Sequence, residues 1–154
     1  MLKAIALDMD NTLLNSNKEI SVTNRDVLRY LNRKGIRIIL CSGRPFATLK
    51  PFLDELHVTK NDDVCVCFNG GLVRLVRDHT VIKANTLSKE QIKPVYDLVK
   101  ENGFKLDIVA EDEVYSLTEF GKSSYQTMIP KQMPFIDTTF SKVPVSYTHL
   151  TLPT

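Results

Sequence analysis

Two aspartates separated by one residue follow the first apolar run of the chain. Asp8 closes the run KAIALD at residues 3–8, and Asp10 lies two positions further, in a polar and turn-rich stretch. Burial penalises charge, so such carboxylates either mark the place where the strand reaches the surface or are aimed at a ligand. A carboxylate can attack phosphorus to form an acyl phosphate. A second carboxyl can protonate the leaving oxygen and then activate the water that cleaves the intermediate. The pair therefore predicts phosphoryl-transfer chemistry.

Attack on a phosphate by a carboxylate needs help, because the two anions repel each other. A divalent cation and hydrogen-bond donors supply that help in phosphoryl-transfer sites. The second apolar run ends in SGRP at Ser42–Pro45, and the third ends in NGG at Asn69–Gly71. Ligands of open parallel sheets bind at the carboxyl ends of the strands. We therefore expect these polar ends to meet the two aspartates, and the Ser42 hydroxyl to contact a phosphate oxygen.

The elements that carry these residues alternate in type. Strands are predicted at 3–8, 36–41 and 64–68, because each run is short and apolar and the run at 36–41 is rich in β-branched residues. Between them, helices are predicted from a start signal formed by Thr23 and Asp26 up to a stop at Gly35, and over 46–56. Strands and helices that alternate in this way predict a parallel sheet with right-handed crossovers.

The pattern changes after Gly71. Residues 72–84 alternate like a hairpin that turns at Arg77–His79, and residues 104–117 alternate like a second hairpin that turns at Glu111–Asp112. The helix between them has Ser88 as its cap, Gln91 three residues later and Gly103 as its stop. Pro94 lies beyond the first turn, so the helix is expected to start later or to kink. We place a domain boundary near residue 80, with one part over 1–80 and the next over 81–144.

Composition excludes several classes of partner. The chain has 154 residues, a formal net charge of +2, 43% hydrophobic residues and 25% charged residues. No block of basic residues points to nucleic acid or to an anionic membrane, and no apolar run approaches the roughly 18 residues of a membrane span. The three cysteines lie inside apolar runs and are expected to be packing groups in a reducing cytoplasm.

The motifs together resemble a known family. DMDNTLL resembles the first motif of the haloacid dehalogenase-like hydrolases, Asp-x-Asp-x-Thr, and LCSGRP resembles their second motif. NGG after the third strand and a new unit that begins in the eighties resemble the Cof-type sugar-phosphatase branch. The resemblance covers residues 1 to about 120. It implies an α/β fold: a three-layer, Rossmann-like parallel-sheet core with the beginning of an inserted α/β cap.

The resemblance also implies a role for each matched residue. Asp8 would be the nucleophile and would bind Mg²⁺ through one side-chain oxygen. Asp10 would be the general acid/base and would bind the same ion through its backbone carbonyl. Thr12 would fix the loop geometry, and Ser42 would hold the transferring phosphoryl group. The remaining matched positions would be loop supports or substrate-side contacts: Gly43, Arg44 and Asn69.

Simpler explanations exist for several of these residues. Thr12 also fits a turn, and Arg44 also fits a solvated charge or a structural ion pair with an acid. Asn69–Gly71 also fits a tight turn. Three histidines are scattered along the chain and are expected at the surface: His57, His79 and His149. The acidic group 111–113 is expected to be a hairpin turn and not a metal site.

Two motifs of the family have no counterpart in the sequence: a lysine after the cap, and a late Gly-Asp strand end that completes the metal site. We therefore expect a truncated form with little or no activity. Residues 145–154, VSYTHLTLPT, show neither a helical period nor a clear strand period and resemble a non-native tail.

Two function classes stay open from the sequence. The first is a Mg²⁺-dependent phosphatase that acts on a small phosphorylated metabolite, such as a sugar phosphate. The second is a non-enzymatic module, an incomplete fold that binds metal weakly. A receiver-like phosphoacceptor domain fits less well, because that class needs an aspartate after the third strand, where this chain has Asn69. The sequence gives no indication of the oligomeric state.

Overall fold

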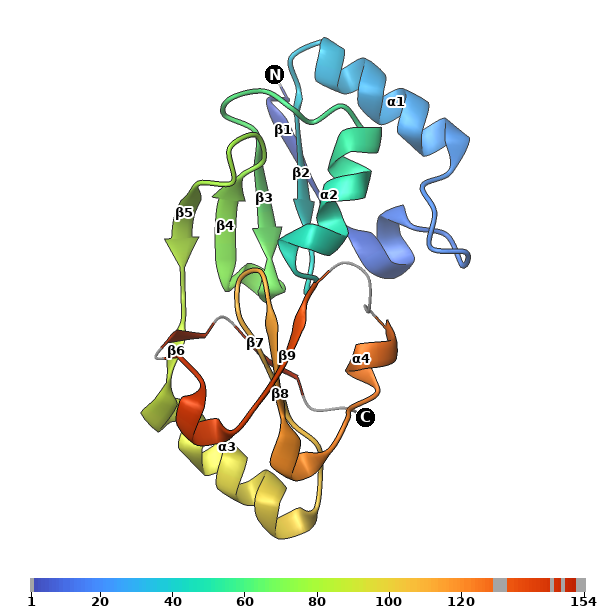
Figure 1. The fold of residues 1–154 in the computed structure, drawn as a ribbon. Helices are drawn as coiled ribbons and strands as arrows, with labels where there is room; N and C mark the ends of the chain where they lie inside the picture. The colour runs from blue at the N-terminus through green and yellow to red at the C-terminus, as the bar shows by residue number, and fades with distance from the viewer. Residues whose placement is uncertain (1, 129–132, 145, 148, 152–154) are drawn as a thin grey trace. The chain divides into compact units, whose positions relative to one another are not determined.

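The chain forms two compact units, Met1–Ala84 and Asn85–Thr154 (Figure 1). The computed structural model describes residues 2–128, 133–144, 146–147 and 149–151. The division falls at the end of the first predicted hairpin, so both strands of that hairpin belong to the first unit. Each unit has its own sheet, and each is described by itself.

The first unit is built on a five-stranded sheet in the order β1-β2-β3-β4-β5. Its strands are β1 Ala4–Asp8, β2 Arg37–Cys41, β3 Val64–Cys67, β4 Leu72–Leu75 and β5 Val81–Ala84. The first three strands are parallel, as predicted. The predicted hairpin is also present, but its strands continue the same sheet in antiparallel pairing, so the sheet is mixed and not wholly parallel.

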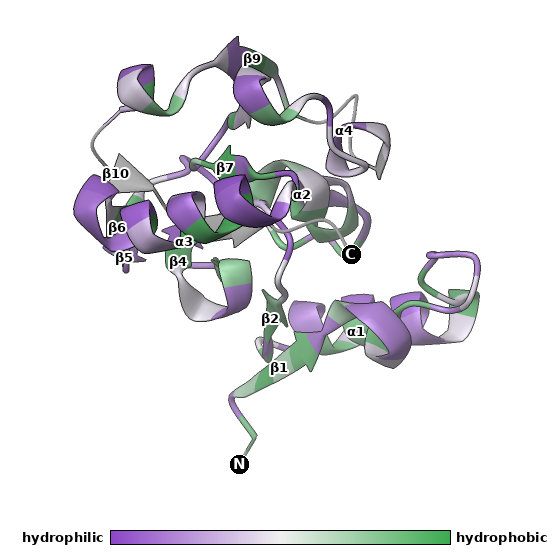
Figure 2. Cartoon of the chain, turned by 90° about the horizontal axis from the view of Figure 1, so that it is seen from below, coloured by the Kyte–Doolittle hydropathy of each residue, from purple (hydrophilic) through white to green (hydrophobic). Residues whose placement is uncertain are grey.

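Two helices connect the parallel strands: α1 Val22–Arg33 and α2 Phe46–Glu55. The predicted start signal of α1 was wrong. Ser21 is the cap, and its hydroxyl accepts a hydrogen bond from the backbone N–H of Asn24. Thr23 and Asp26 have the same spacing as a cap pair, but both lie inside the helix. Figure 2 shows hydrophobic colouring along β1 and β2, and mixed colouring on α1. A mixed helix beside apolar strands is typical of an α/β core.

The middle strands of the sheet bury one of their two faces, whereas β1 and β5 contain no buried residue. Ile38, Leu40, Cys65 and Cys67 are at most 1% exposed, and they alternate with half-buried neighbours along β2 and β3. Cys65 and Cys67 are reduced thiols buried in this packed layer, in agreement with their predicted packing role.

An irregular turn, Met9–Leu13, follows β1. Met9 and Leu13 are buried and anchor the two ends of the turn, and the N–H of Leu14 donates to the carbonyl of Met9 at 2.9 Å. Asn11 has φ of 61°, a left-handed conformation that asparagine tolerates better than most residues. The chain therefore bends directly after Asp8. The polar residues of the motif lie on a tight loop whose two ends, Met9 and Leu13, are buried.

The second unit has a four-stranded sheet in the order β11-β7-β8-β9. Its strands are β7 Asp107–Val109, β8 Val114–Leu117, β9 Phe135–Thr138 and β11 His149–Thr151. The predicted hairpin of residues 104–117 is confirmed as β7 and β8. β9 was not predicted, and it pairs with β8 in parallel. One further pair, β6 Leu87–Ser88 with β10 Ser146–Tyr147, lies outside this sheet.

Helix α3 Lys89–Asn102 begins where its capping residues predict, at Ser88 and Gln91, which form both hydrogen bonds of a capping box. Gly103, with φ of 68°, ends the helix. The expectation that Pro94 delays the start was wrong, because the capping box stabilises the first turn and only one backbone donor is lost. The apolar side of α3, with Ile92 and Val99, packs in the core of the unit. A short helix, α4 Tyr125–Met128, follows β8.

Part of the predicted tail, residues 145–154, belongs to strands. Residues 146–147 pair with β6, and residues 149–151 pair with β7. The expectation of no strand structure is therefore wrong for these positions. Residues 145, 148 and 152–154 lie outside the described residues. Whether the segment is native to the protein stays a prediction.

Candidate active site

Three strand ends of the first unit meet in one pocket of about 300 Å³, called here the strand-end pocket. It is lined by Asp8, Cys41, Ser42, Val66, Asn69 and Gly70. The register of the parallel strands causes this meeting, because Asp8 lies beside Cys41 and Cys41 lies beside Val66. Residues that follow these three positions must then share one edge of the sheet. The predicted residues Asp8, Ser42 and Asn69 are therefore brought together.

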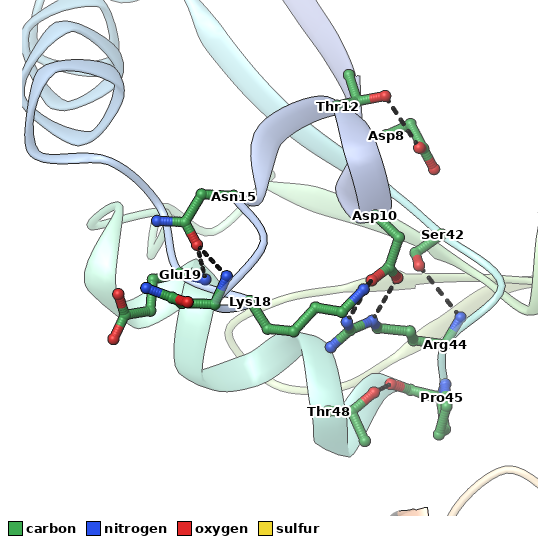
Figure 3. A network of polar contacts seen from close by, with 11 residues as sticks. Asp8, Asp10, Thr12, Asn15, Lys18, Glu19, Ser42, Arg44, Pro45 and Thr48 are labelled. Carbon is green, nitrogen blue, oxygen red and sulfur yellow. Dashed lines mark hydrogen bonds and ion pairs between the residues drawn. The ribbon is translucent and has the colours of Figure 1, made fainter.

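Asp8 reaches the pocket with one carboxylate oxygen already engaged. The Thr12 hydroxyl donates to Asp8 Oδ2 at 3.2 Å across the turn that follows β1 (Figure 3). No described residue donates to the other oxygen. Thr12 thus orients the carboxylate and leaves its other oxygen available to a ligand. The loop-fixing role predicted for Thr12 would act through this direct contact with Asp8.

Ser42 is 7% exposed and is fixed by its neighbours on both sides. Its backbone N–H donates to the carbonyl of Val66, and its carbonyl accepts from the N–H of Asn69, both at 3.0 Å. Its Oγ accepts from the N–H of Arg44 at 3.3 Å. No described residue accepts a hydrogen bond from the Ser42 hydroxyl, so its proton is available to a ligand in the pocket.

Gly43 and Asn69 lie against each other. A Cβ at Gly43 would lie 3.0 Å from the Asn69 side-chain oxygen, which is tighter than most side-chain contacts, so glycine suits this close approach of the two loops. Asn69 is in a left-handed conformation, with φ of 53°, inside the tight turn Phe68–Gly70. The turn explanation for Asn69 is confirmed, and this turn places the residue in the lining of the strand-end pocket; a contact with substrate stays a prediction.

Asp10 and Arg44 form a second cluster beside the pocket. Arg44 donates to both carboxylate oxygens of Asp10, from Nε at 2.9 Å and from Nη2 at 2.8 Å. Lys18 Nζ donates to Asp10 Oδ1 at 2.8 Å (Figure 3). The structural ion pair considered for Arg44 is therefore present. The Arg44 guanidinium, and after it Lys18, holds the pKa of Asp10 well below its usual range, although partial burial opposes the shift. Asp10 is ionised in this arrangement.

Lys18 is a site residue that sequence reasoning missed. It lies on a loop closed by the bridge between Leu14 and Ile20. The Asn15 side chain accepts from the backbone N–H groups of Asn17 and Glu19, at 2.9 and 3.0 Å. Lys18 itself has φ of 62°. The one available signal was the Asn-rich stretch NSNKE, which is typical of turns. A turn by itself does not reveal where a lysine side chain reaches.

The oxygen donors here suit a hard divalent cation in type. Asp8 offers one carboxylate oxygen, while the Asp10 carboxylate is occupied by cations, so Asp10 could contribute only its backbone carbonyl. Mg²⁺ takes few protein oxygens and keeps several waters, so this small donor set is compatible with it. Among the residues that the structure describes, no group of three or more His, Cys, Asp or Glu side chains could hold a metal ion.

Comparison with known proteins decides the family. The family model described as haloacid dehalogenase-like hydrolase matches residues 5–148. This chain belongs to that family. The matched residues include every lining residue of the strand-end pocket and most of the second unit.

Relatives and solved structures agree with the assignment. YxeH of Bacillus subtilis is 32% identical over 142 residues, which cover 89% of this chain and 53% of YxeH. The 5-amino-6-(5-phospho-D-ribitylamino)uracil phosphatase YwtE of the same organism is 27% identical over 115 residues, covering 75% of this chain and 38% of YwtE. The chain spans about half the length, or less, of these curated relatives.

A solved structure supports the fold class. The crystal structure of a haloacid dehalogenase-like hydrolase from Bacteroides thetaiotaomicron has 27% identity and a TM-score of 0.78. The alignment covers 94% of this chain and 56% of that one. The predicted α/β, Rossmann-like fold class and the predicted family are confirmed. Within the described parts of the chain, no helix has the length and apolar composition that crossing a membrane requires.

Proposed function

We propose that this chain carries the nucleophile end of a phosphatase that hydrolyses a small phosphorylated metabolite. The observation that carries the proposal is the strand-end pocket, where Asp8, the Ser42 hydroxyl and Asn69 meet in a chain of this hydrolase family. Two negatively charged groups have to react in such a site. A pocket with one free carboxylate oxygen and one free hydroxyl proton offers both the nucleophile and a donor for the phosphoryl oxygens.

The proposed reaction has two displacements. In the first, an Asp8 oxygen forms a bond to phosphorus, and the bond between phosphorus and the leaving oxygen breaks while Asp10 gives that oxygen a proton. In the second, Asp10 takes a proton from water, the water oxygen bonds to phosphorus, and the bond to Asp8 breaks to release phosphate. Ser42 donates a hydrogen bond to the phosphoryl group in both displacements.

The ion pairs of Asp10 bear on this scheme. Bound by Arg44 and Lys18, the Asp10 carboxylate is a base and holds no proton. The first displacement needs Asp10 protonated, so we propose that at least one of its two cation contacts is broken when substrate enters. The phosphate of the substrate is an anion that competes with Asp10 for Arg44 and Lys18.

We further propose Mg²⁺ as the cofactor, held by one side-chain oxygen of Asp8 and by the Asp10 carbonyl, while the other Asp8 oxygen makes the attack. When bound, the ion would neutralise charge between the carboxylate and the phosphate. We propose that the first unit is the N-terminal part of the catalytic core and that the second is the beginning of a cap. YwtE is named for a phosphorylated ribityl compound, which supports a small phosphorylated metabolite as the substrate class.

The test is phosphate release from a panel of sugar phosphates and flavin mononucleotide, with Mg²⁺ and with EDTA. The chain is measured beside a protein in which the same residues are extended to the length of YxeH. Mg²⁺-dependent release by the extended protein, lost in its Asp8→Asn variant, supports the proposal. Absence of release from every phosphorylated compound by a folded extended protein would favour the non-enzymatic module.

A further inference from the structure

Two cations bind the Asp10 carboxylate, and their surroundings constrain them differently. Arg44 donates two hydrogen bonds to it, has 26% of its side chain exposed and lies over the Phe52 ring. The backbone N–H of Arg44 also donates to the Ser42 hydroxyl oxygen. The Lys18 ammonium donates one hydrogen bond among the described residues, and 58% of the Lys18 side chain is exposed. An exposed, single contact is the easier one for an incoming anion to displace.

The turn that carries Lys18 is held by bonds that do not involve the lysine side chain. The N–H of Asn15 donates to the carbonyl of Glu19 at 2.9 Å, and the N–H of Lys18 donates to the carbonyl of Asn15 at 3.0 Å. The bridge that closes the base of the turn joins two buried aliphatic residues. The ammonium can therefore leave Asp10 while the turn keeps its backbone bonds. Its four-carbon stem and three rotatable donors let it change acceptor.

The Asp10 cluster is connected to the strand-end pocket at two points. Asp10 is two residues from Asp8 in the chain, and the backbone of Arg44 contacts Ser42. Figure 3 shows the side chains of Lys18 and Arg44 converging on the Asp10 carboxylate. A phosphate monoester carries up to two negative charges on three oxygens, so it attracts an ammonium more strongly than a single carboxylate does. A phosphoryl group in the pocket would thus compete with Asp10 for the more weakly held cation.

From this difference between the two cations we infer that Lys18 is a phosphate-binding residue. Its ammonium moves from Asp10 to the phosphoryl group of the substrate, while Arg44 stays paired with Asp10. The inference rests on the proposed function, because that function places the phosphoryl group in the strand-end pocket. It identifies which of the two cation contacts is broken when substrate enters, and it assigns the released ammonium a contact with substrate.

The test is a titration of the ¹⁵N-labelled chain with inorganic phosphate in a buffer that contains Mg²⁺, while backbone amide shifts are recorded. Saturable shifts are expected at Ser42 and Asn69 in the pocket and at Asn17 and Glu19 in the turn. Lys18→Met should raise the apparent Kd roughly fivefold, as expected for loss of a solvent-exposed charge pair, and should abolish the shifts in the turn. Lys18→Arg keeps the charge and should restore most of the affinity.

Asp10→Asn distinguishes Lys18 from Arg44 as the cation that moves. Loss of the carboxylate charge should lower the apparent Kd for phosphate in any background, because one repulsion is removed. The decrease should be larger in the chain with Lys18 than in the Lys18→Met chain, because only the former also gains a released ammonium. The matched control is Lys50→Met, which removes an exposed pair with Asp54 on α2 of the same unit and should leave the apparent Kd unchanged.

Three results would overturn the inference. The first is an apparent Kd that is the same in Lys18→Met and in the unchanged chain. The second is an equal decrease from Asp10→Asn in both backgrounds, which would assign the exchange to Arg44. The third is the absence of saturable shifts with phosphate. Phosphate that binds without help from Lys18 would leave the proposed reaction intact, whereas absence of phosphate release by the extended protein would count against the reaction and not against this contact.

Discussion

The carboxylate of Asp8 in the strand-end pocket and the buried carboxylate of Asp107 in the sheet of the second unit have opposite surroundings. Asp8 comes from a strand end and is joined by residues of two other loops, and one of its oxygens has no donor among the described residues. Asp107 comes from the middle of a sheet face, and both of its oxygens accept hydroxyl hydrogen bonds. A carboxylate at a strand end can react, because its surroundings are incomplete. A carboxylate inside a sheet is fully coordinated and holds its neighbours in place.

The surroundings of the Asp10 carboxylate are intermediate between those of Asp8 and those of Asp107. Asp10 lies on the loop after β1, with 39% of its side chain exposed, and it accepts three hydrogen bonds from two cations. The guanidinium of Arg44 is itself held over the Phe52 ring, at 5.8 Å from the ring centroid. The difference between Asp8 and Asp10 shows that two carboxylates of one motif can have different availability. Substitutions in the three environments should therefore have effects of different size and kind.

The largest effect is expected at Asp8. In a catalytically active protein that carries these residues, Asp8→Asn should reduce kcat by at least about 10⁴-fold, because the amide cannot form the acyl phosphate. The change should leave the folded structure intact, since among the described residues only Thr12 makes a hydrogen bond to the side chain. The control is Asp26→Asn on α1, with expected kcat unchanged. Near-normal turnover in Asp8→Asn would show that Asp8 is not the nucleophile.

Asp107→Ala should affect stability and leave the strand-end pocket intact. The change leaves the hydroxyls of Ser116 and Ser123 without their acceptor, and a hydrogen bond to a charged group contributes roughly 1.5–3 kcal/mol. We expect the free energy of unfolding, measured by urea denaturation, to fall by about 3 kcal/mol. Asp97→Ala, which removes an exposed pair with Lys93, is the matched control and should cost less than about 0.5 kcal/mol. Equal losses in both variants would mean that the hydrogen bonds of Asp107 stabilise the fold no more than the exposed ion pair of Asp97 does.

Ser42→Ala tests the donor side of the strand-end pocket. Loss of one buried hydrogen bond to the phosphoryl group should lower kcat/KM by about 10- to 100-fold, corresponding to roughly 1–3 kcal/mol. Catalysis should persist, because Ser42 binds phosphate and does not attack it. Complete loss of activity, with the amide spectrum of the folded protein preserved, would assign Ser42 a larger role than this account gives it.

The smallest effect is expected at Lys18. Lys18 and Asp10 are 58% and 39% exposed, so solvent screens their pair, and Lys18→Met should lower the free energy of unfolding by less than about 1 kcal/mol at pH 7. Because the folded-state pKa of Asp10 is lowered, its contribution is present above the ordinary aspartate pKa, near 3.9, and is lost as the pH falls below it. The difference between Lys18→Met and the unchanged chain should therefore shrink below about pH 4 and in high salt. A difference that grows on acidification would contradict the ion-pair assignment.

The sequence predicts the pocket better than the ion pairs around it. Asp8, Ser42 and Asn69 each follow an apolar run, so the parallel register alone brings them together. The contact of Lys18 with Asp10 depends on the left-handed conformation of Lys18 in an irregular loop, which composition does not specify. Both a substrate contact and a structural ion pair were considered for Arg44; the ion pair with Asp10 is present, and the substrate contact stays a prediction.

The same contrast applies to the second unit. The capping box of α3 involves residues three positions apart, and it was predicted in full from the sequence. The pairing of Ser116 with Asp137 depends on β9, which was not predicted although Phe, Ile and Thr, three of its four residue types, favour strands. Without β9 the register is unknown, and Asp137 cannot be placed beside Ser116. Interactions across strands that are distant in sequence are therefore the part that the sequence does not determine.

The most direct test of the central claim is the site of covalent phosphorylation. The catalytically active, extended protein is incubated with Mg²⁺ and a phosphorylated substrate, quenched in acid and reduced with borohydride, which converts an aspartyl phosphate to homoserine. Mass spectrometry of the peptides should locate homoserine at position 8 alone, and the Asp8→Asn variant should show none. Phosphate found on Ser42, or turnover without any modification at Asp8, would contradict the account.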